Sequence, residues 1–240
     1  MSDELKFNCK QCGNCCKTIR KRQQYVEEEE KEFIKNYFYG KLPIIQLEPP
    51  EKMTIQIWPW EARKIIAAAK QKGTELCIKP LRAVFDLEKE ESIITTYFLD
   101  SDECTLLGTD NKCRVYDERP LSCRQFPLQN AAEFAECPGT NNINVKTAQI
   151  LGSYEGLLNY FGDSFKSAEK NDNLVLWQNT IMMNLMKAKK IRPARNYPYP
   201  FLLKRIQQSQ EKGKIIDFDE FLVREGLAKK EELEKIKNNE

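Results

Sequence analysis

Histidine is absent from this chain of 240 residues. Without histidine, neither a Ser–His–Asp triad nor a Cys–His pair can be assembled for nucleophilic catalysis. The ten glycines form neither G-x-G-x-x-G nor G-x-x-x-x-G-K-[ST], so the usual phosphate-binding loops of nucleotide sites are missing too. The C-x3-C-x2-C spacing of radical enzymes fails because Ile19 stands where its third cysteine would be. The most easily recognised enzyme classes are therefore set aside.

The chain also lacks long apolar runs and an excess of one charge. No uninterrupted apolar stretch approaches the roughly 20 residues that span a bilayer, and residues 1–10 contain no apolar region of a secretory signal. Charged residues make up 31% of the chain but nearly cancel, to a formal net charge of +2. This balance argues against a general nucleic-acid coat or a membrane-surface protein. We expect a cytoplasmic protein that binds neither membrane nor nucleic acid, and a protein partner stays open.

What the chain does contain is cysteine. Eight of its nine cysteines fall into two groups, a CxxCxxCC motif at residues 9–16 and a second group spread over residues 104–137. The eight are Cys9, Cys12, Cys15, Cys16, Cys104, Cys113, Cys123 and Cys137. Thiolates are soft ligands that select zinc or iron–sulfur centres, and a reducing compartment disfavours disulfides. The sequence therefore predicts a metalloprotein in which the two groups converge on shared inorganic ions.

The spacing of the first group suggests how it would bind. A CxxC pair turns the chain so that two sulfurs face one ion, and Gly13 would relieve crowding in that turn. Bacterial ferredoxins place three ligands of one cubane in this way, with a fourth cysteine followed by proline, as Cys137 is. Adjacent side chains diverge on an extended backbone, so Cys15 and Cys16 would serve two centres more easily than one. Two four-sulfur centres, or one centre with four thiols to spare, both stay open.

Cations near the cysteines fit the same interpretation. Four thiolates on zinc, or on an oxidised four-iron cluster, leave a net charge of about minus two. Such a site needs hydrogen-bond donors and positive charge around it. Arg119 and Arg124 lie within a few residues of Cys123. We assign both arginines to the surroundings of the cofactor.

The two cysteine blocks resemble the YkgJ-type CxxCxxCC cysteine-cluster family, a zinc- or iron-chelating domain. Residues 113–127 are similar to that family's C-x-[IV]-Y-x-x-R-P-x-x-C-R-x-[FY]-P stretch, and the resemblance covers residues 7–140. It implies that the eight cysteines are ligands, and it adds five motif residues of unassigned role, Tyr116, Arg119, Pro120, Arg124 and Pro127. Cys77 has no counterpart in the pattern, and its Leu-Cys-Ile setting is typical of a buried apolar thiol.

Three functions follow from the cysteines and the resemblance. Members of the family are often described as iron–sulfur-cluster-containing proteins, which implies a cluster, most simply 4Fe–4S. A zinc-stapled interaction module is the alternative from a different class, because four thiolates also suit structural zinc. A related cysteine domain is associated with flagellin lysine methylases, so the resemblance also allows a cluster-containing methyltransferase-like enzyme. No methyl-donor site or substrate pocket is identifiable in the sequence, and catalytic residues stay unknown.

The spacing of apolar residues predicts an α+β fold. Residues 81–87 and 92–99 are rich in β-branched and aromatic side chains around a charged turn, which predicts a hairpin leading into Cys104. We also expect a strand at 53–57 and helices at 27–40, 58–73, 147–165, 174–190, 200–212, 218–225 and 229–237. The composition changes near residue 145. We therefore expect a loop-rich metal-binding domain at 1–145, with the hairpin and helices, and a helical C-terminal region at 146–240.

Overall fold

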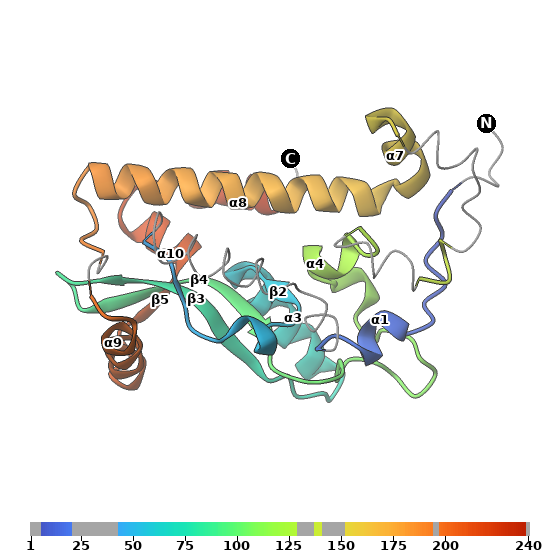
Figure 1. The fold of residues 1–240 in the computed structure, drawn as a ribbon, viewed down its shortest axis with the longest axis horizontal. Coiled ribbons are helices and arrows are strands. Elements are labelled where there is room, and N and C mark those ends of the chain that lie inside the picture. The colour runs from blue at the N-terminus through green and yellow to red at the C-terminus, as the bar shows by residue number, and fades with distance from the viewer. Residues whose placement is uncertain (1–5, 21–42, 129–136, 141–151, 194–196, 239–240) are drawn as a thin grey trace.

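The computed structural model describes residues 6–20, 43–128, 137–140, 152–193 and 197–238. Helices and one small sheet make up this structure, which confirms the α+β class (Figure 1). The helix expected at 27–40 lies outside the described residues. No helix in the described parts is both long and apolar enough to cross a membrane.

The sheet is built on the predicted hairpin. Strands β3 (Ile78–Asp86) and β4 (Glu91–Leu99) pair antiparallel along their whole length. Two short strands, β1 (Ile45–Gln46) and β2 (Gln56–Ile57), pair antiparallel with β3 and β4 respectively, and β5 (Ile215–Asp217) runs parallel to β4. The strand predicted at 53–57 is shortened to β2, because the turn of the 3-10 helix η4 (Pro50–Lys52) binds the amide of residue 53.

Helices confirm most of the predicted pattern. Proline at the first position opens α3 (Pro59–Gln71), and Gly73, in the left-handed region, follows its end. The C-terminal helices are α7 (Tyr154–Phe161), α8 (Asp163–Lys187), α9 (Tyr199–Glu211), α10 (Phe218–Arg224) and α11 (Lys230–Asn238). Two boundaries differ: the helix expected to reach residue 165 ends at Phe161, and α8 begins at Asp163, eleven residues before the expected 174. Residues 147–151 of the first expected C-terminal helix lie outside the residues that the structure describes.

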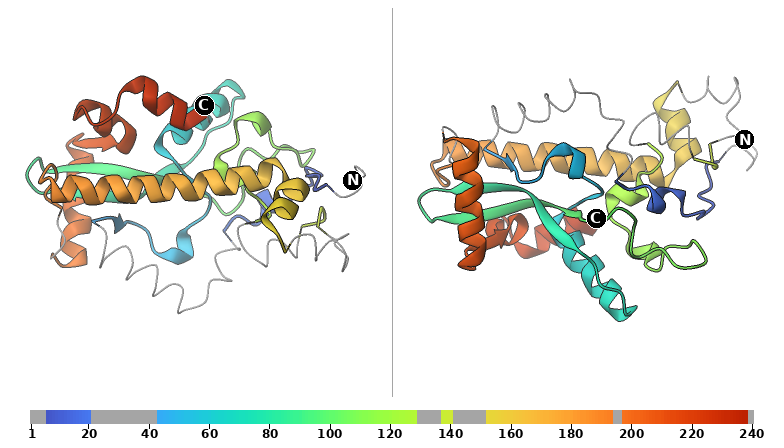
Figure 2. Two further views of the ribbon diagram at one scale, coloured as in Figure 1. Left: turned by 90° about the horizontal axis from the view of Figure 1, so that it is seen from above. Right: turned by 60° about the horizontal axis from the view of Figure 1, so that its bottom comes forward.

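Helices cover both faces of the sheet. Val84 and Ile93 pack with Met182 of α8 and with Phe218 of α10 on one face, and α9 packs on the other, as Figure 1 shows. Each fully buried side chain of this size contributes about 1.5–3 kcal/mol. Residues on both sides of position 145 thus share one core, and the division into two domains there stays a prediction. Figure 2 shows α8 running along nearly the full length of the molecule, with α9 at one end and α7 at the other.

Candidate metal centre

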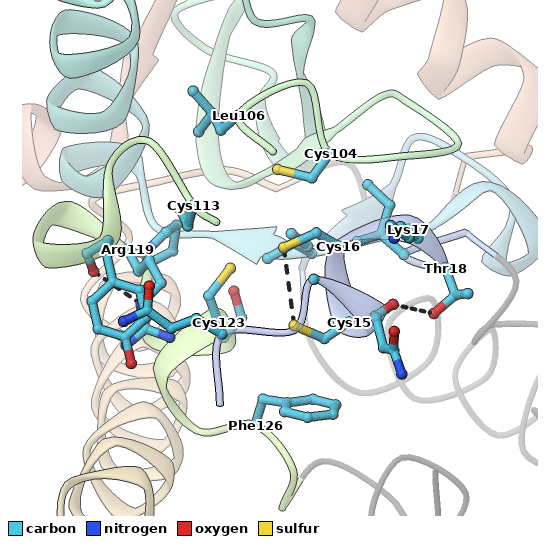
Figure 3. Close-up of a pocket in the computed structure, with 18 of the residues that line it drawn as sticks. Cys15, Cys16, Lys17, Thr18, Cys104, Leu106, Cys113, Arg119, Cys123 and Phe126 are labelled. Atoms are coloured by element: carbon cyan, nitrogen blue, oxygen red, sulfur yellow. Dashed lines mark hydrogen bonds between the residues drawn. The ribbon is translucent and has the colours of Figure 1, made fainter. Parts of the chain in front are cut away.

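A cavity of about 460 Å³ lies at the end of the molecule where the N-terminal segment meets the loops after β4 (Figure 3). All eight cysteines of the two sequence groups line it. Segments about a hundred residues apart in the chain are therefore brought to one site. Among the described lining residues, no aspartate or glutamate is present. This donor set is soft, and it fits zinc or iron–sulfur chemistry better than calcium or magnesium.

The first group is shaped by the short helix α1 (Asn14–Lys17). Gly13 caps this helix with φ 78°, and its carbonyl accepts hydrogen bonds from the amides of Cys16 and Lys17. A Cβ at this position would lie 2.9 Å from the carbonyl oxygen of Asn111. Both the left-handed backbone and the close approach require glycine, which confirms the expected role of Gly13.

The prediction that Cys15 and Cys16 diverge on an extended backbone is wrong. Both residues lie in α1, and their Sγ atoms are 3.9 Å apart. Four sulfurs at 2.3 Å around one ion are about 3.8 Å from each other. The helical turn thus brings the two adjacent thiols to a separation that a single ion accepts.

The second group folds back onto α1 through backbone hydrogen bonds. The amide of Cys104 donates to the carbonyl of Cys16 at 2.8 Å, and a bridge between Leu107 and Cys113 closes the loop between them. Helix α4 (Leu121–Arg124) carries Cys123. The amide of Leu121, the first residue of α4, donates to the Glu61 carboxylate of α3 at 2.8 Å. This hydrogen bond fixes α4 against α3.

Five thiols influence one another and form what we call the inner set, Cys15, Cys16, Cys104, Cys113 and Cys123. A hydrogen bond with Cys104 raises the pKa of Cys16 to about 12, and burial adds to the shift while a hydrogen bond with Cys15 opposes it. Burial raises the pKa of Cys123 well above its usual value, with the nearby Cys16, Cys15 and Cys113 thiols contributing. Figure 3 shows Cys15, Cys16, Cys104 and Cys123 around a common space.

The remaining three thiols form an outer set, Cys9, Cys12 and Cys137. Burial raises the pKa of the Cys137 thiol, and the neighbouring thiols that add to this shift are Cys9 and Cys12. Hydrogen bonds from the amide and hydroxyl of Thr140 to the carbonyl of Cys137 hold the turn that carries it. Among the described residues, no three ligand side chains are already gathered closely enough to hold a metal ion.

A comparison with protein families shows to which family the chain belongs. The model of the CxxCxxCC family, described as a putative zinc- or iron-chelating domain, matches residues 8–141. The chain belongs to the CxxCxxCC family. The match includes all eight cysteines of the cavity and confirms the resemblance seen in the sequence. No curated protein and no solved structure matches the chain.

The two motif arginines of the CxxCxxCC domain, Arg119 and Arg124, lie in different positions relative to the sulfurs. The Arg119 guanidinium is 3.5 Å from the centre of the Tyr116 ring, and its charge acts on the Cys113 and Cys123 thiols, opposing the rise of their pKa. Arg124 instead donates to the carbonyls of Arg119 and Asp117, both at 2.6 Å. Arg119 is therefore the cation beside the sulfurs, and Arg124 holds the turn between the short helix η5 (Tyr116–Glu118) and α4.

The ninth cysteine of the CxxCxxCC protein is exposed, so its predicted burial is wrong. Cys77 precedes β3 in an extended segment, where successive side chains point to opposite sides. Leu76 and Ile78 pack against the apolar cluster beneath the cavity, which turns Cys77 outward. The alternation of side chains around Cys77, and not the apolar character of the stretch, was the signal that could have predicted its exposure.

Sequence reasoning also missed the apolar wall of the cavity. Ile65 of α3, Leu99 at the end of β4, and Leu106 and Val115 of the loops line the cavity and are buried. These residues are separated along the chain and share no motif, so only the fold brings them together. A wall of this kind excludes water from one side of the sulfur site and lowers its local dielectric.

Proposed function

We propose that this protein binds iron–sulfur clusters through the cysteines of its CxxCxxCC domain. The observation that supports this most directly is the cavity of about 460 Å³ whose wall carries eight thiols. A structural zinc ion is enclosed by four thiolates at about 2.3 Å and needs far less space. A cluster brings inorganic sulfide of its own, and the cavity volume falls within the roughly 300–1,000 Å³ of typical cofactor pockets.

The inner and outer sets suggest how the thiols would divide between two four-sulfur centres. The outer set has three members, and Cys15 completes the CxxCxxC repeat that begins with Cys9. We assign Cys9, Cys12, Cys15 and Cys137 to one centre and Cys16, Cys104, Cys113 and Cys123 to the other. This division uses every thiol of the cavity and gives each centre the four cysteines that an iron–sulfur cluster takes. Arg119 would supply positive charge and hydrogen-bond donors to the second centre.

Zinc is the second candidate, and one distance favours it. The 3.9 Å between the Sγ atoms of Cys15 and Cys16 is close to the edge of a zinc–sulfur tetrahedron. In that case the metal would staple α1 to the loop after β4 as a structural element. Removing it with a chelator would loosen this end of the molecule.

A visible absorption spectrum of protein purified without oxygen separates the two candidates. An iron–sulfur protein is brown, and its broad absorption bleaches when a reductant is added. A zinc protein is colourless and does not respond to reduction, because Zn²⁺ has no redox chemistry. A colourless preparation that contains zinc would overturn the cluster proposal and support the structural one.

A further inference from the structure

A second, larger hollow adjoins the cysteine cavity. It is an open groove of about 1800 Å³ between α3, α4, α8 and α11. Six residues line both the groove and the cavity, Cys9, Cys15, Tyr116, Arg119, Cys123 and Phe126. Anything bound in the groove would therefore lie against the wall of the sulfur site.

Five cations line this groove without a carboxylate in salt-bridge contact among the described residues, Lys64, Arg119, Arg124, Lys170 and Lys230. Arg119, Arg124 and Lys170 donate hydrogen bonds to backbone carbonyls instead, as in the 2.7 Å bond from Lys170 Nζ to the carbonyl of Lys237. Other cations of the groove differ. Arg63, for example, is paired with Asp219 at 2.5 Å, and Lys237 is 3.0 Å from the same carboxylate.

The acid Glu61 acts on two of these cations and cannot neutralise both. Glu61 lies near Arg124 and Lys170, so two positive charges face one carboxylate. Its oxygens already accept hydrogen bonds from the amides of Leu121 at 2.8 Å and Trp58 at 3.2 Å. The groove is lined by ten lysines and arginines against seven aspartates and glutamates, Asp117 and Glu118 included, so positive charge is left over in the groove as a whole.

The dimensions and the aromatic side chains indicate what kind of anion fits. The groove volume exceeds the roughly 300–1,000 Å³ of pockets for small molecules. Trp60, Tyr116 and Phe126 line it and are partly exposed. Aromatic residues and arginine are enriched where proteins bind one another. These features favour an extended protein segment over a single small anion.

We propose that this groove binds an acidic segment of a partner protein, whose carboxylates pair with Arg124 and Lys170 beside the cysteine cavity. The inference goes beyond metal binding. It holds whether the site binds iron or zinc, because Lys170 belongs to α8 and does not line the cysteine cavity. It places the partner in contact with Cys9 and Cys123. The partner would therefore reach the edge of the metal site without entering the cavity.

The test measures binding of a capped hexapeptide of glutamate to the metal-loaded protein at low salt. We expect binding that weakens as salt rises from about 50 to 200 mM, and no binding of the matching glutamine peptide. Lys170→Met should weaken binding about tenfold, equivalent to about 1.4 kcal/mol. Lys204→Met removes the same charge from the exposed face of α9, distant from the groove, and should leave binding unchanged.

Further readouts keep the result interpretable. Lys170→Arg should retain binding, because the charge is kept, and metal content should be the same in all three variants. Equal affinity in Lys170→Met and Lys204→Met would overturn the proposal, as would the absence of peptide binding. Inorganic phosphate that binds as tightly as the peptide would also overturn it, in favour of a small-anion site. Loss of metal without loss of peptide binding would count against the metal proposal alone.

Discussion

At the scale of single residues, the adjacent cysteines of α1 decide how many centres the site holds. The two-centre assignment predicts that Cys16→Ser and Cys104→Ser each remove the same half of the metal, because one missing thiolate opens a four-sulfur site. Cys12→Ser and Cys137→Ser should each remove the other half. Metal content per chain measures this directly.

The exposed Cys77 provides the matched control. Cys77→Ser also removes one thiol but lies outside the cavity, so it should keep all of the metal. Combining Cys16→Ser with Cys104→Ser should lose no more than either change alone. If every single substitution in the cavity instead removes all of the metal, a single centre is correct.

The raised pKa values of four cavity thiols, Cys16, Cys113, Cys123 and Cys137, predict how metal binding depends on pH. With a pKa of about 12, the Cys16 thiol is protonated throughout the neutral range when no metal is bound. Metal must displace these protons, so affinity falls as pH falls, by about tenfold per pH unit for each ligand thiol. Loading the apoprotein in weakly buffered solution near neutral pH should release close to one proton from each of these four thiols. Metal uptake without acidification would contradict the assignment of protonated thiols as ligands.

Gly13 tests the local geometry of the cluster motif. Gly13→Ala should lower the free energy of unfolding by about 1–2 kcal/mol from the left-handed backbone alone, and by more because its Cβ would meet the carbonyl of Asn111. Gly73→Ala is the control, since Gly73 has φ 67° but nothing within 4 Å of an added Cβ. Denaturant unfolding of both variants measures the difference. Equal losses would show that the close approach to Asn111 does not matter.

At the scale of elements, the periodic and β-branched segments could be predicted from the sequence. The β3–β4 hairpin and α3 were found because their side-chain patterns and their proline and glycine signals agree with the fold. Residues 166–173 of α8 were missed because this part carries no apolar stripe. Its buried residues begin at Leu174 and continue through Gln178, Met182 and Leu185. A helix that is polar on all sides gives no periodic signal.

The candidate site was predictable as a set of ligands but not as an arrangement. The cysteine spacings identified the eight thiols, since their residue type alone indicates metal chemistry. Their division into an inner and an outer set depends on the loop that returns Cys104 to the carbonyl of Cys16. That contact joins residues 88 positions apart, and no local pattern encodes it.

An acid in α10 ties three helices together, which gives a prediction at this scale. The Asp219 carboxylate is buried and binds Arg63 of α3 at 2.5 Å and Lys237 of α11 at 3.0 Å. Asp219→Ala should lower the free energy of unfolding by about 1–3 kcal/mol, because the buried salt bridges that join α3 and α11 to α10 through this carboxylate are lost, although Arg63 keeps Asp217 and Lys237 keeps Glu234. Asp163→Ala, at a fully exposed carboxylate, should change it by less than about 0.5 kcal/mol. Equal stabilities of the two variants would show that this tie contributes nothing.

At the scale of the whole molecule, the metal site and the helix-covered core lie at different places along α8. The core around Met182, Phe218 and Phe221 contains none of the cavity cysteines. Removing the metal should therefore increase hydrogen exchange in α1 and in the loop from Cys104 to Cys113, and leave α8 and α10 near residues 182 and 218 protected. Exchange that rises equally in both regions would mean that the metal supports the entire fold.

Elemental analysis of protein purified without oxygen is the sharpest test of whether the cysteine cavity binds iron–sulfur clusters. Iron, zinc and labile sulfide are measured in one sample, beside a Cys77→Ser preparation as the control for thiol number. We expect iron and labile sulfide in comparable amounts, little zinc, and the same values for Cys77→Ser. Zinc without sulfide, or neither metal nor sulfide, would contradict the assignment of iron–sulfur clusters to the cysteine cavity.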